Sequence, residues 1–371
     1  MTKSDLVNKS HGSLDSIHGL QWRIKEPQTA VLESLDIDLS TIASSQFVVQ
    51  TLYSAVSPGT ELAIFRGIDP DVHAADGWCR YPWSAGYAGV GRVIRVGNDV
   101  QSVRVGDIVT GILGHASHWV MDDQVGQNGK KFLWSDRFVG KVRQPIPLEQ
   151  AAFVRLYGIA MTAIQALHPL RWGQILVSGL GTIGTMVAQL AMLHGFSVTG
   201  VDPSCERRQA VMRDGISAID PHSLDKRTDR WDAVVDTVGL AVNTVMLPNH
   251  LNIGGVLVLM THWRSQPPID CSSFINEIFN KGLTVRGALE YGMGSLPWEN
   301  WPELQRAKWN LIEEHMQRGR LAFTDFETVP YNHLPRAYKD LDTRHGPVGR
   351  LLDWTSLGLR GEPKTQHAVP M

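Results

Sequence analysis

Hydrophobic positions follow two different patterns along the chain. From about residue 20 to 150, short apolar runs of strand length alternate with Gly, Pro and Asp. This pattern predicts many short strands, in a small β-rich barrel or sandwich. From about residue 155, strand-like and helix-like segments alternate, which predicts a parallel sheet covered by helices. The chain is therefore predicted to be α/β with two domains, and the segment GRLLDW (349–354) is expected to return to the first.

Length and composition agree with this division. The chain has 371 residues, which exceeds what one compact core usually holds. Residues 1–18 and 361–371 are polar and aperiodic and are interpreted as loose tails. The 35 basic and 37 acidic residues nearly balance, and no basic block occurs. A small-molecule substrate is therefore expected, rather than nucleic acid or a membrane surface.

Cellular context is predicted from the start of the chain and from its thiols. The N-terminal segment lacks the apolar run of a signal peptide, and no apolar run long enough to span a bilayer occurs. Cys79, Cys205 and Cys271 stand apart, without CxxC pairs. Isolated thiols suit a reducing compartment, so a cytoplasmic protein is expected.

The strongest motif is GLGTIG at residues 179–184. Gly179, Gly181 and Gly184 form G-x-G-x-x-G directly after an apolar strand and at the start of a predicted helix. Gly179 allows a tight turn, Gly181 lets a pyrophosphate approach the backbone, and Gly184 lets the helix lie close to the sheet. Together with Thr182 and Ile183, whose amides open the helix, they predict a dinucleotide site.

The second strand of this unit predicts which dinucleotide binds. Asp202 ends the segment SVTGVD, and a carboxylate there accepts hydrogen bonds from the adenosine ribose hydroxyls of NAD and repels the 2′-phosphate of NADP. Arg207 and Arg208 follow closely and could hold a phosphate. NAD is the predicted cofactor, with NADP as the alternative.

These motifs, in this order, resemble the medium-chain dehydrogenase/reductase superfamily. The resemblance covers about residues 20 to 355. It rests on the fingerprint and on the segments SPGTELAIFRG (57–67), YPWSAGYAGVGRVIRVG (81–97), VRVGDIVTG (103–111), EQAAFVRLYGIAMTAIQAL (149–167), WDAVVDTVG (231–239) and GGVLVLM (254–260).

The resemblance implies a fold and an assembly. It implies a GroES-like β-barrel catalytic domain (19–156 and 291–360), a Rossmann NAD-binding domain with a doubly wound parallel sheet (157–290), and an active site between them. Family members commonly pair through the last strands of the Rossmann sheet. A homodimer is therefore expected through LTVRGALE (283–290).

The zinc positions of the superfamily hold other residue types here. The resemblance places the metal-binding cysteine at Ser57 or Pro58, the histidine at Tyr87, and the second cysteine at Leu156. None of these is a thiolate, imidazole or carboxylate, and the lobe of four closely spaced cysteines is missing. No metal site is predicted.

Three residues are then candidates for handling a substrate oxygen. Tyr87 takes the position of the zinc histidine and could act as acid or base, or only form a wall of the pocket. Thr60 occupies the position of the proton-relay hydroxyl in the zinc enzymes, or serves only as a turn residue. Glu61 follows, although the family often uses this acidic residue to tie the barrel to an arginine.

Further candidates surround the expected cleft. Ser57, Tyr157 and His262 are predicted to line the substrate pocket, with core packing or simple solvation as the alternative for the last two. Gly239 and Arg350 are predicted cofactor contacts. Arg350 would reach the pyrophosphate as a late arginine does in some relatives, with a surface charge as the alternative.

The motifs SPGTEL and GYAGVG resemble a subgroup that includes the dehydrogenase of 3-hydroxyethyl bacteriochlorophyllide. The predicted activity is NAD-dependent hydride transfer between a secondary alcohol and a ketone, without catalytic zinc, in a biosynthetic pathway. One alternative is a zinc-free enoyl or quinone reductase, which usually prefers NADPH. The other is a nucleotide-binding protein without catalytic activity.

Overall fold

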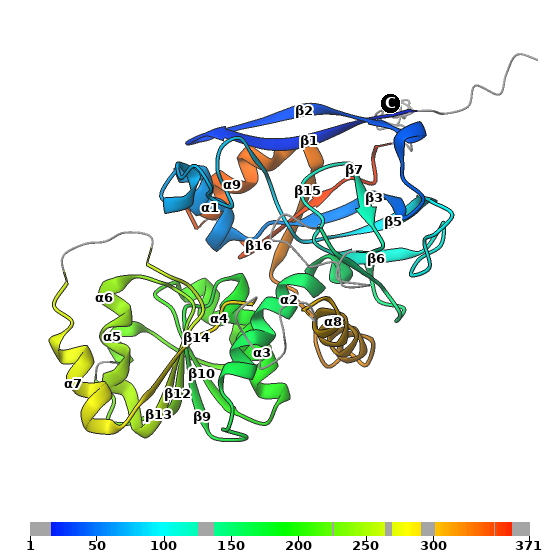
Figure 1. Ribbon diagram of the computed structural model, residues 1–371. Coiled ribbons are helices and arrows are strands. Elements are labelled where there is room, and N and C mark those ends of the chain that lie inside the picture. The colour runs from blue at the N-terminus through cyan, green and yellow to red at the C-terminus, as the bar shows by residue number, and fades with distance from the viewer. Residues whose placement is uncertain are drawn as a thin grey trace, which may run out of the picture.

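The computed structural model describes residues 16–124, 137–224, 226–263, 269–290, 301–344 and 346–357. Figure 1 shows two lobes, one built around the N-terminal strands and one around a parallel sheet. Residues 1–15 and 358–371, which include most of both predicted tails, lie outside the described residues. Residues 16–18 were expected in the tail, but they belong to the first strand, because alternate positions of this strand face the core.

The first lobe is made of two sheets, in which antiparallel pairs predominate, and two helices. A long hairpin pairs with a short strand to form a three-stranded sheet, and seven strands form a mixed sheet. The strands of the three-stranded sheet are β1 (Ser16–Glu26), β2 (Thr29–Asp38) and β4 (Trp83–Ser84). Those of the mixed sheet are β3 (Gln46–Ala55), β5 (Gly89–Val96), β6 (Ile108–Gly111), β7 (His118–Asp122), β8 (Val139–Lys141), β15 (Phe326–Pro330) and β16 (Gly349–Asp353). The helices are α1 (Pro58–Arg66) and α9 (Leu334–Asp342).

The end of the chain returns to this lobe as the sequence predicted. Strand β16 pairs antiparallel with β3, so Leu352 lies opposite Ser54. Eight of the ten β3 residues are buried, because the strand lies in the middle of the sheet between β16, β5 and β7.

The second lobe is a six-stranded parallel sheet with the order β11-β10-β9-β12-β13-β14. Its strands are β9 (Gln174–Ser178), β10 (Ser197–Val201), β11 (Ser217–Ile219), β12 (Trp231–Asp236), β13 (Leu251–Leu259) and β14 (Thr284–Gly287). Its helices are α3 (Thr182–Leu193), α4 (Cys205–Arg213), α5 (Pro221–Leu224), α6 (Ala241–Thr244) and α7 (Ser272–Lys281). The strand order reverses between β9 and β12, and in such sheets ligands bind at the carboxyl ends of the strands beside this point.

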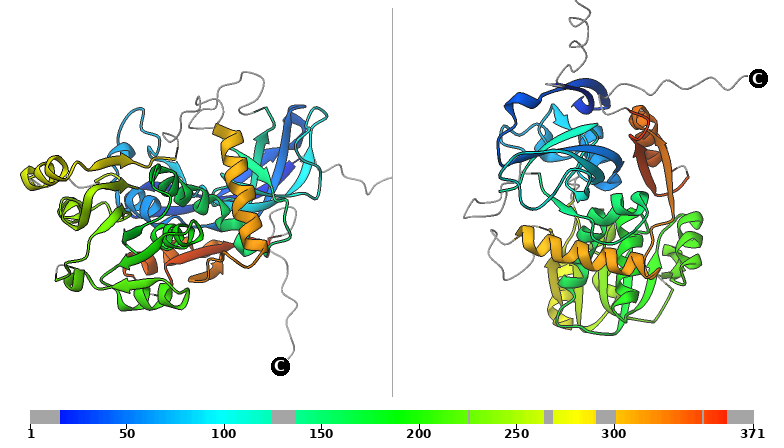
Figure 2. Two further views of the ribbon diagram at one scale, coloured as in Figure 1. Left: turned by 90° about the horizontal axis from the view of Figure 1, so that it is seen from below. Right: turned by 90° about the vertical axis from the view of Figure 1, so that its right-hand side faces the viewer.

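Two long helices connect the lobes. Helix α2 (Leu148–Ala166) packs on β3, β5 and β6 of the first lobe and on α3 of the second, while α8 (Trp301–Gln317) lies across α2. In the right-hand view of Figure 2, α8 runs between the two lobes. The predicted domain boundary at residue 157 falls inside α2, and the boundaries remain a prediction. None of the described helices has the length and hydropathy that crossing a bilayer requires.

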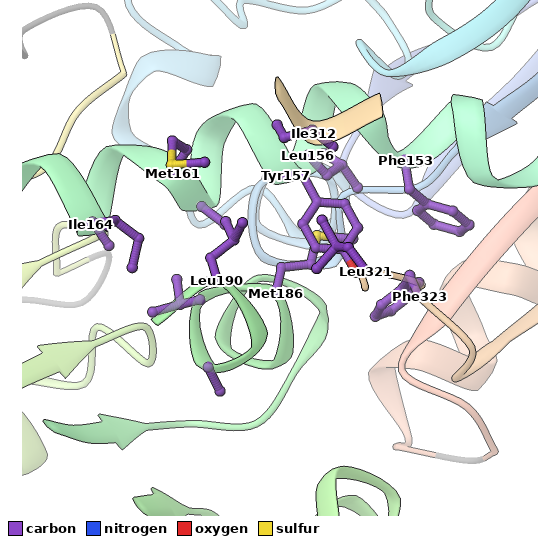
Figure 3. Close-up of a cluster of buried hydrophobic side chains, with 14 of the residues drawn as sticks. Phe153, Leu156, Tyr157, Met161, Ile164, Met186, Leu190, Ile312, Leu321 and Phe323 are labelled. Carbon is purple, nitrogen blue, oxygen red and sulfur yellow. The ribbon is translucent and has the colours of Figure 1, made fainter. Parts of the chain in front are cut away.

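The core around α2 joins both lobes. Fourteen of the 19 residues of α2 are buried. Figure 3 shows Tyr157 of α2 pointing toward Met186 of α3, while Leu156 of α2 lies beside Ile312 of α8. Because these side chains pack from both directions onto one helix, the interface between the lobes is part of the main hydrophobic core.

Substitutions of Phe153 test whether the core around α2 stabilises the fold. The buried ring of Phe153 packs against Phe323 and Phe326, with ring centroids 4.8 Å and 5.0 Å away. We expect Phe153→Ala to lower the free energy of unfolding by about 3–5 kcal/mol, because a cavity would replace the ring. Phe153→Leu should cost clearly less, and denaturant titration measures both. Equal losses for the two variants would contradict this assignment.

Candidate active site

The fingerprint loop lies at the carboxyl end of β9, where its glycines make different contacts. Gly179 has φ +90°, and a Cβ there would lie 2.7 Å from a methyl of Val238. A Cβ on Gly184 would lie 1.9 Å from the carbonyl oxygen of Gly179, so only glycine allows the helix to approach the strand this closely. A Cβ on Gly181 would meet nothing within 4 Å. At Gly184 the helix therefore packs tightly against the loop, whereas the space beside Gly181 is empty. A pyrophosphate could approach the backbone at Gly181.

Helix α3 presents unused amides at this opening. The first hydrogen bond of the helix runs from the Thr185 amide to the Gly181 carbonyl at 2.9 Å, so the amides of residues 182–184 have no partner inside the helix. The Thr182 hydroxyl donates to the carbonyl of Val348 at 2.7 Å, which brings the segment before β16 to the start of α3. The half-buried Ile183 packs on the main core.

Asp202 lies where β10 ends, and its carboxylate contacts the fingerprint loop. Its oxygens accept the amides of Leu180 and Ser204, both at 2.9 Å, and the Arg207 guanidinium lies 3.5 Å away. Each carboxylate oxygen has two lone pairs, so acceptor capacity remains for a ribose. Arg208 is held by the Asp202 carbonyl and by Asp220.

Gly239 and His262 lie on the neighbouring strand ends. Gly239 has φ +67°, and a Cβ there would lie 2.5 Å from a methyl of Thr261 and 3.1 Å from the carbonyl of His262. The His262 side chain is exposed. Burial raises the pKa of the neighbouring Asp236, against the lowering effect of hydrogen bonds from Thr244, Val238 and Gly239.

On the barrel side, three hydroxyl groups meet. The Tyr87 hydroxyl donates to Ser57 Oγ at 2.5 Å, and a Thr60 hydrogen bond acts on the same phenol. Ser57 is the residue before α1, and Thr60 lies in its first turn, which Pro58 opens. The structure therefore brings together Ser57, Thr60 and Tyr87, which the sequence suggested separately.

Burial, hydrogen bonds and two nearby charges determine the pKa of the Tyr87 phenol. Burial raises its pKa above 10, and the carboxylate of Glu61 adds to this effect. The hydrogen bonds to Ser57 and Thr60 and the positive charge of Arg155 lower it. The Arg155 guanidinium lies 6.0 Å from the centre of the Tyr87 ring. The net shift is upward, so the phenol keeps its proton at neutral pH.

Glu61 contacts the backbone of Ser57 and so fixes the position of the Ser57 hydroxyl. It is fully buried and accepts hydrogen bonds from the Ser57 amide (2.7 Å) and the Tyr338 hydroxyl (2.7 Å), and it contacts His115 Nε2 (2.9 Å). Its contacts are structural, and they position Ser57 rather than reach a substrate. The resemblance implied an arginine as the partner of Glu61, but the structure gives it His115 and Tyr338, and no local motif identifies either residue.

Arg350 lies elsewhere in the barrel. It is fully buried, its guanidinium donates to the carbonyls of Pro347 (2.5 Å) and Gly349 (3.0 Å), and its Nε lies 3.5 Å from a carboxylate oxygen of Glu327. The segment that it holds is the one that contacts Thr182. A direct contact with a pyrophosphate remains a prediction.

Tyr157 does not join the candidate site. Its buried side chain points from α2 toward α3, beside Met186, and its hydroxyl donates to Gln189 at 2.5 Å (Figure 3). The expectation that Tyr157 lines the substrate pocket is therefore not supported by its position. Adjacent residues of a helix point about 100° apart, so Tyr157 faces α3 although the neighbouring Leu156 takes the position of a zinc ligand in the resemblance.

A buried charged pair that no motif predicted lies beside Tyr87. Arg155 forms an ion pair with Glu290 at 2.5 Å, and both side chains are buried. A single arginine within the apolar run AAFVRLYGIAM was the available signal, since arginine is rarely buried without a partner.

The residues at the superfamily's zinc positions do not fit a zinc ion. Ser57 and Tyr87 contact each other, and Leu156 is a buried apolar residue in the core of α2. Within the described ranges, no group of three or more His, Cys, Asp or Glu side chains is arranged to hold a metal. Glu61, whose carboxylate accepts the Ser57 amide, contacts the His115 imidazole at 2.9 Å.

Comparisons with known proteins agree with this architecture. Residues 182–308 match the family model described as zinc-binding dehydrogenase. Cinnamyl alcohol dehydrogenase 5 of Arabidopsis thaliana is 28% identical over 218 residues, which cover 50% of this chain and 60% of that protein. The L-threonine 3-dehydrogenase of Streptomyces coelicolor is 27% identical over 367 residues, covering 90% and 99%.

Solved structures show the same fold. The structure of CAD from Helicobacter pylori, complexed with NADP(H), superposes with a TM-score of 0.70 at 14% identity, over 91% of this chain and 99% of that one. The predicted fold class, a GroES-like barrel with a Rossmann domain, is confirmed. These findings support the medium-chain dehydrogenase/reductase superfamily for this chain, whereas the zinc-free subgroup remains a prediction.

The different roles of two glycines give a matched test. Gly184→Ala should lower both the thermal stability and the affinity for NADH, because its methyl would collide with the Gly179 carbonyl. Gly181→Ala should leave the melting temperature nearly unchanged and weaken only NADH binding. Thermal unfolding and calorimetric titration separate the two effects. A stable Gly184→Ala variant with normal affinity would contradict the described packing.

Proposed function

We propose that this protein transfers hydride between a secondary alcohol and a ketone, using NAD and no catalytic zinc. The observation that carries the proposal is the contact of Tyr87 with Ser57 and Thr60 at the positions of the superfamily's metal site. Hydrogen-bond donors at this point can meet the charge that develops on a substrate oxygen. The similarity to dehydrogenases named for cinnamyl alcohol and for L-threonine supports the oxidation or reduction of a hydroxyl-bearing carbon.

Tyr87 is proposed as the acid in ketone reduction. When bound, the nicotinamide supplies or accepts the hydride at the substrate carbon. For this step the O–H of Tyr87, which points to Ser57 Oγ in the structure, turns to the carbonyl oxygen and transfers its proton there, and the hydroxyls of Ser57 and Thr60 then donate to the phenol oxygen. Arg155 stabilises the phenolate that forms, since its positive charge lowers the pKa of Tyr87. In the oxidation direction the same phenolate takes the hydroxyl proton of the alcohol.

The chemistry of the donors supports the zinc-free part of the proposal. A hydroxyl, a phenol and a leucine occupy the three positions, whereas catalytic zinc needs about three nitrogen, sulfur or carboxylate ligands. The chain thus combines the sequence features of a zinc-dehydrogenase family with a site built for hydrogen bonding.

NAD is proposed as the cofactor because Asp202 ends β10 next to the fingerprint loop. A carboxylate there disfavours the 2′-phosphate of NADP. The two arginines that could offset it are engaged, since Arg207 faces Asp202 itself and Arg208 contacts Asp220.

A homodimer in a reducing compartment completes the proposal. Strand β14 is the edge of the Rossmann sheet, and its exposed backbone could pair with a second copy. Helix α7 beside it exposes Ile275 (58%) and Phe279 (84%), apolar surface that a partner would cover. The three cysteines are free thiols. A role in biosynthesis rests only on the resemblance to the subgroup.

The Tyr87→Phe variant tests whether Tyr87 is the proton donor in ketone reduction. Using a panel of secondary alcohols and ketones, we expect kcat to fall by about 10²–10⁴-fold with little change in NADH affinity. Because the pKa of Tyr87 is raised above 10, ketone reduction by the wild type should keep its rate up to about pH 9. Alcohol oxidation should instead accelerate with rising pH, because the base form becomes populated. The variant should lose this acceleration.

Tyr81→Phe is the control, because this residue lies in the same segment and donates to the carbonyl of Ile64 instead. It should keep its activity. A wild type that binds NADH but turns over no substrate would favour a nucleotide-binding protein. One equivalent of zinc in the purified protein, with activity lost to a chelator and restored by the metal, would refute the zinc-free proposal.

Asp202→Asn tests the cofactor. The wild type should bind NADH at least about tenfold more tightly than NADPH in calorimetric titrations, a difference of about 1.4 kcal/mol. The variant keeps the size of the side chain and removes its charge, so this preference should shrink mainly through tighter NADPH binding. A wild type that prefers NADPH would support the enoyl or quinone reductase alternative.

A further inference from the structure

A groove of about 600 Å³ lies between α2, α3 and α8. Its volume falls within the range of small-molecule sites. It is formed by the last turns of α2, the residues that follow α3, and the middle of α8. In the right-hand view of Figure 2, α8 runs along the side of the molecule where the lobes meet.

The groove is at the opposite edge of the parallel sheet from the nucleotide site. Its residues Leu170 and Arg171 precede β9, and His194 and Phe196 precede β10. They therefore lie at the amino ends of these strands. Gly179 and Asp202 lie at the carboxyl ends of the same strands, so a ligand in the groove would not occupy the cofactor site.

The lining is apolar on one part and basic on another. Met161, Ile164, Phe196 and Leu311 contribute apolar surface. Arg171 and Lys308 contribute positive charge, with His168 and His194 beside them, and no acidic side chain belongs to the lining. Such a combination is complementary to a ligand with an apolar body and one negative charge.

Lys308 gives independent support. Its side chain is only 5% exposed, and its Nζ has no hydrogen-bond partner among the described residues. Burying an ammonium without a hydrogen bond is costly. Burial lowers the pKa of Lys308 to about 8, while the carboxylate of Glu290 raises it and the charge of Arg155 lowers it. The amine thus remains largely protonated at neutral pH, and its Nζ is buried on the side of Glu290 and Arg155 while the residue lines the groove.

We propose that this groove binds an amphipathic carboxylate, with its chain on Met161, Ile164, Phe196 and Leu311 and its head group at Lys308 and Arg171. The flexible four-carbon stem of Lys308 lines the groove and lets its ammonium turn toward the head group. The groove lies outside the cofactor site and its proposal does not rest on the dehydrogenase reaction, although the charges of Arg155 and Glu290 act on Lys308.

Dodecanoate is the probe, titrated calorimetrically into the full chain with saturating NADH. We expect one site per chain, with an affinity unaffected by NADH. Arg171→Glu and Lys308→Met should each weaken binding by about 10–100-fold, the effect of losing a charged hydrogen bond. Ala307→Trp should abolish binding by filling the groove from its exposed rim. Dodecyltrimethylammonium, with the opposite charge, should not bind.

Arg213→Glu is the matched control, because it makes the same charge change on an exposed position of α4 outside the groove. It should bind dodecanoate like the wild type. No binding at submillimolar dodecanoate would overturn the proposal. So would binding that NADH displaces, binding that persists in Ala307→Trp, or equal binding of the cationic amphiphile.

Discussion

The geometry of the candidate site depends on one buried carboxylate. Glu61 has no contact with solvent, so its oxygens must be satisfied by the protein. The partners come from three parts of the chain: the amide of Ser57 before α1, His115 after β6, and Tyr338 of α9. Removing any one of them would leave a buried charge or donor unpaired. The network therefore fixes the start of α1, and with it the two hydroxyls that contact Tyr87.

The same network extends further into the barrel. His115 uses its second nitrogen to contact Ser54 at 2.8 Å, and Ser54 also accepts the indole N–H of Trp354. Gly86 has φ +79°, and a Cβ there would lie 2.8 Å from the His115 ring, so the residue before Tyr87 packs directly on this imidazole. Tyr87 is thus held from two directions, through its hydroxyl and through its backbone.

Much of the fold could be predicted from the sequence, because the signals that define it are local. Strand and helix periodicity, and the glycines of the fingerprint, depend on residues close together in the chain. The cluster of Tyr87, Ser57 and Thr60 could be predicted only in part, from motifs whose order resembles a known superfamily. His115 and Glu290 join the site through contacts across 54 and 135 residues, which no local pattern encodes. The prediction that Tyr157 lines the substrate pocket was wrong for a different reason. The direction of its side chain depends on where α3 packs against α2, which the sequence of α2 alone does not determine.

Replacing a metal with hydrogen bonds has a consequence for the chemistry of the proposed site. A metal ion stabilises an alkoxide by charge alone, whereas a phenol must transfer its proton and become charged itself. In the half-buried environment of Tyr87 that charge is costly, and the carboxylate of Glu61 adds to the cost. Arg155 is the nearby positive charge that offsets both, and its own pairing with Glu290 limits how far it can do so. The balance leaves the phenol protonated at neutral pH, and a protonated donor serves reduction of a ketone better than oxidation of an alcohol.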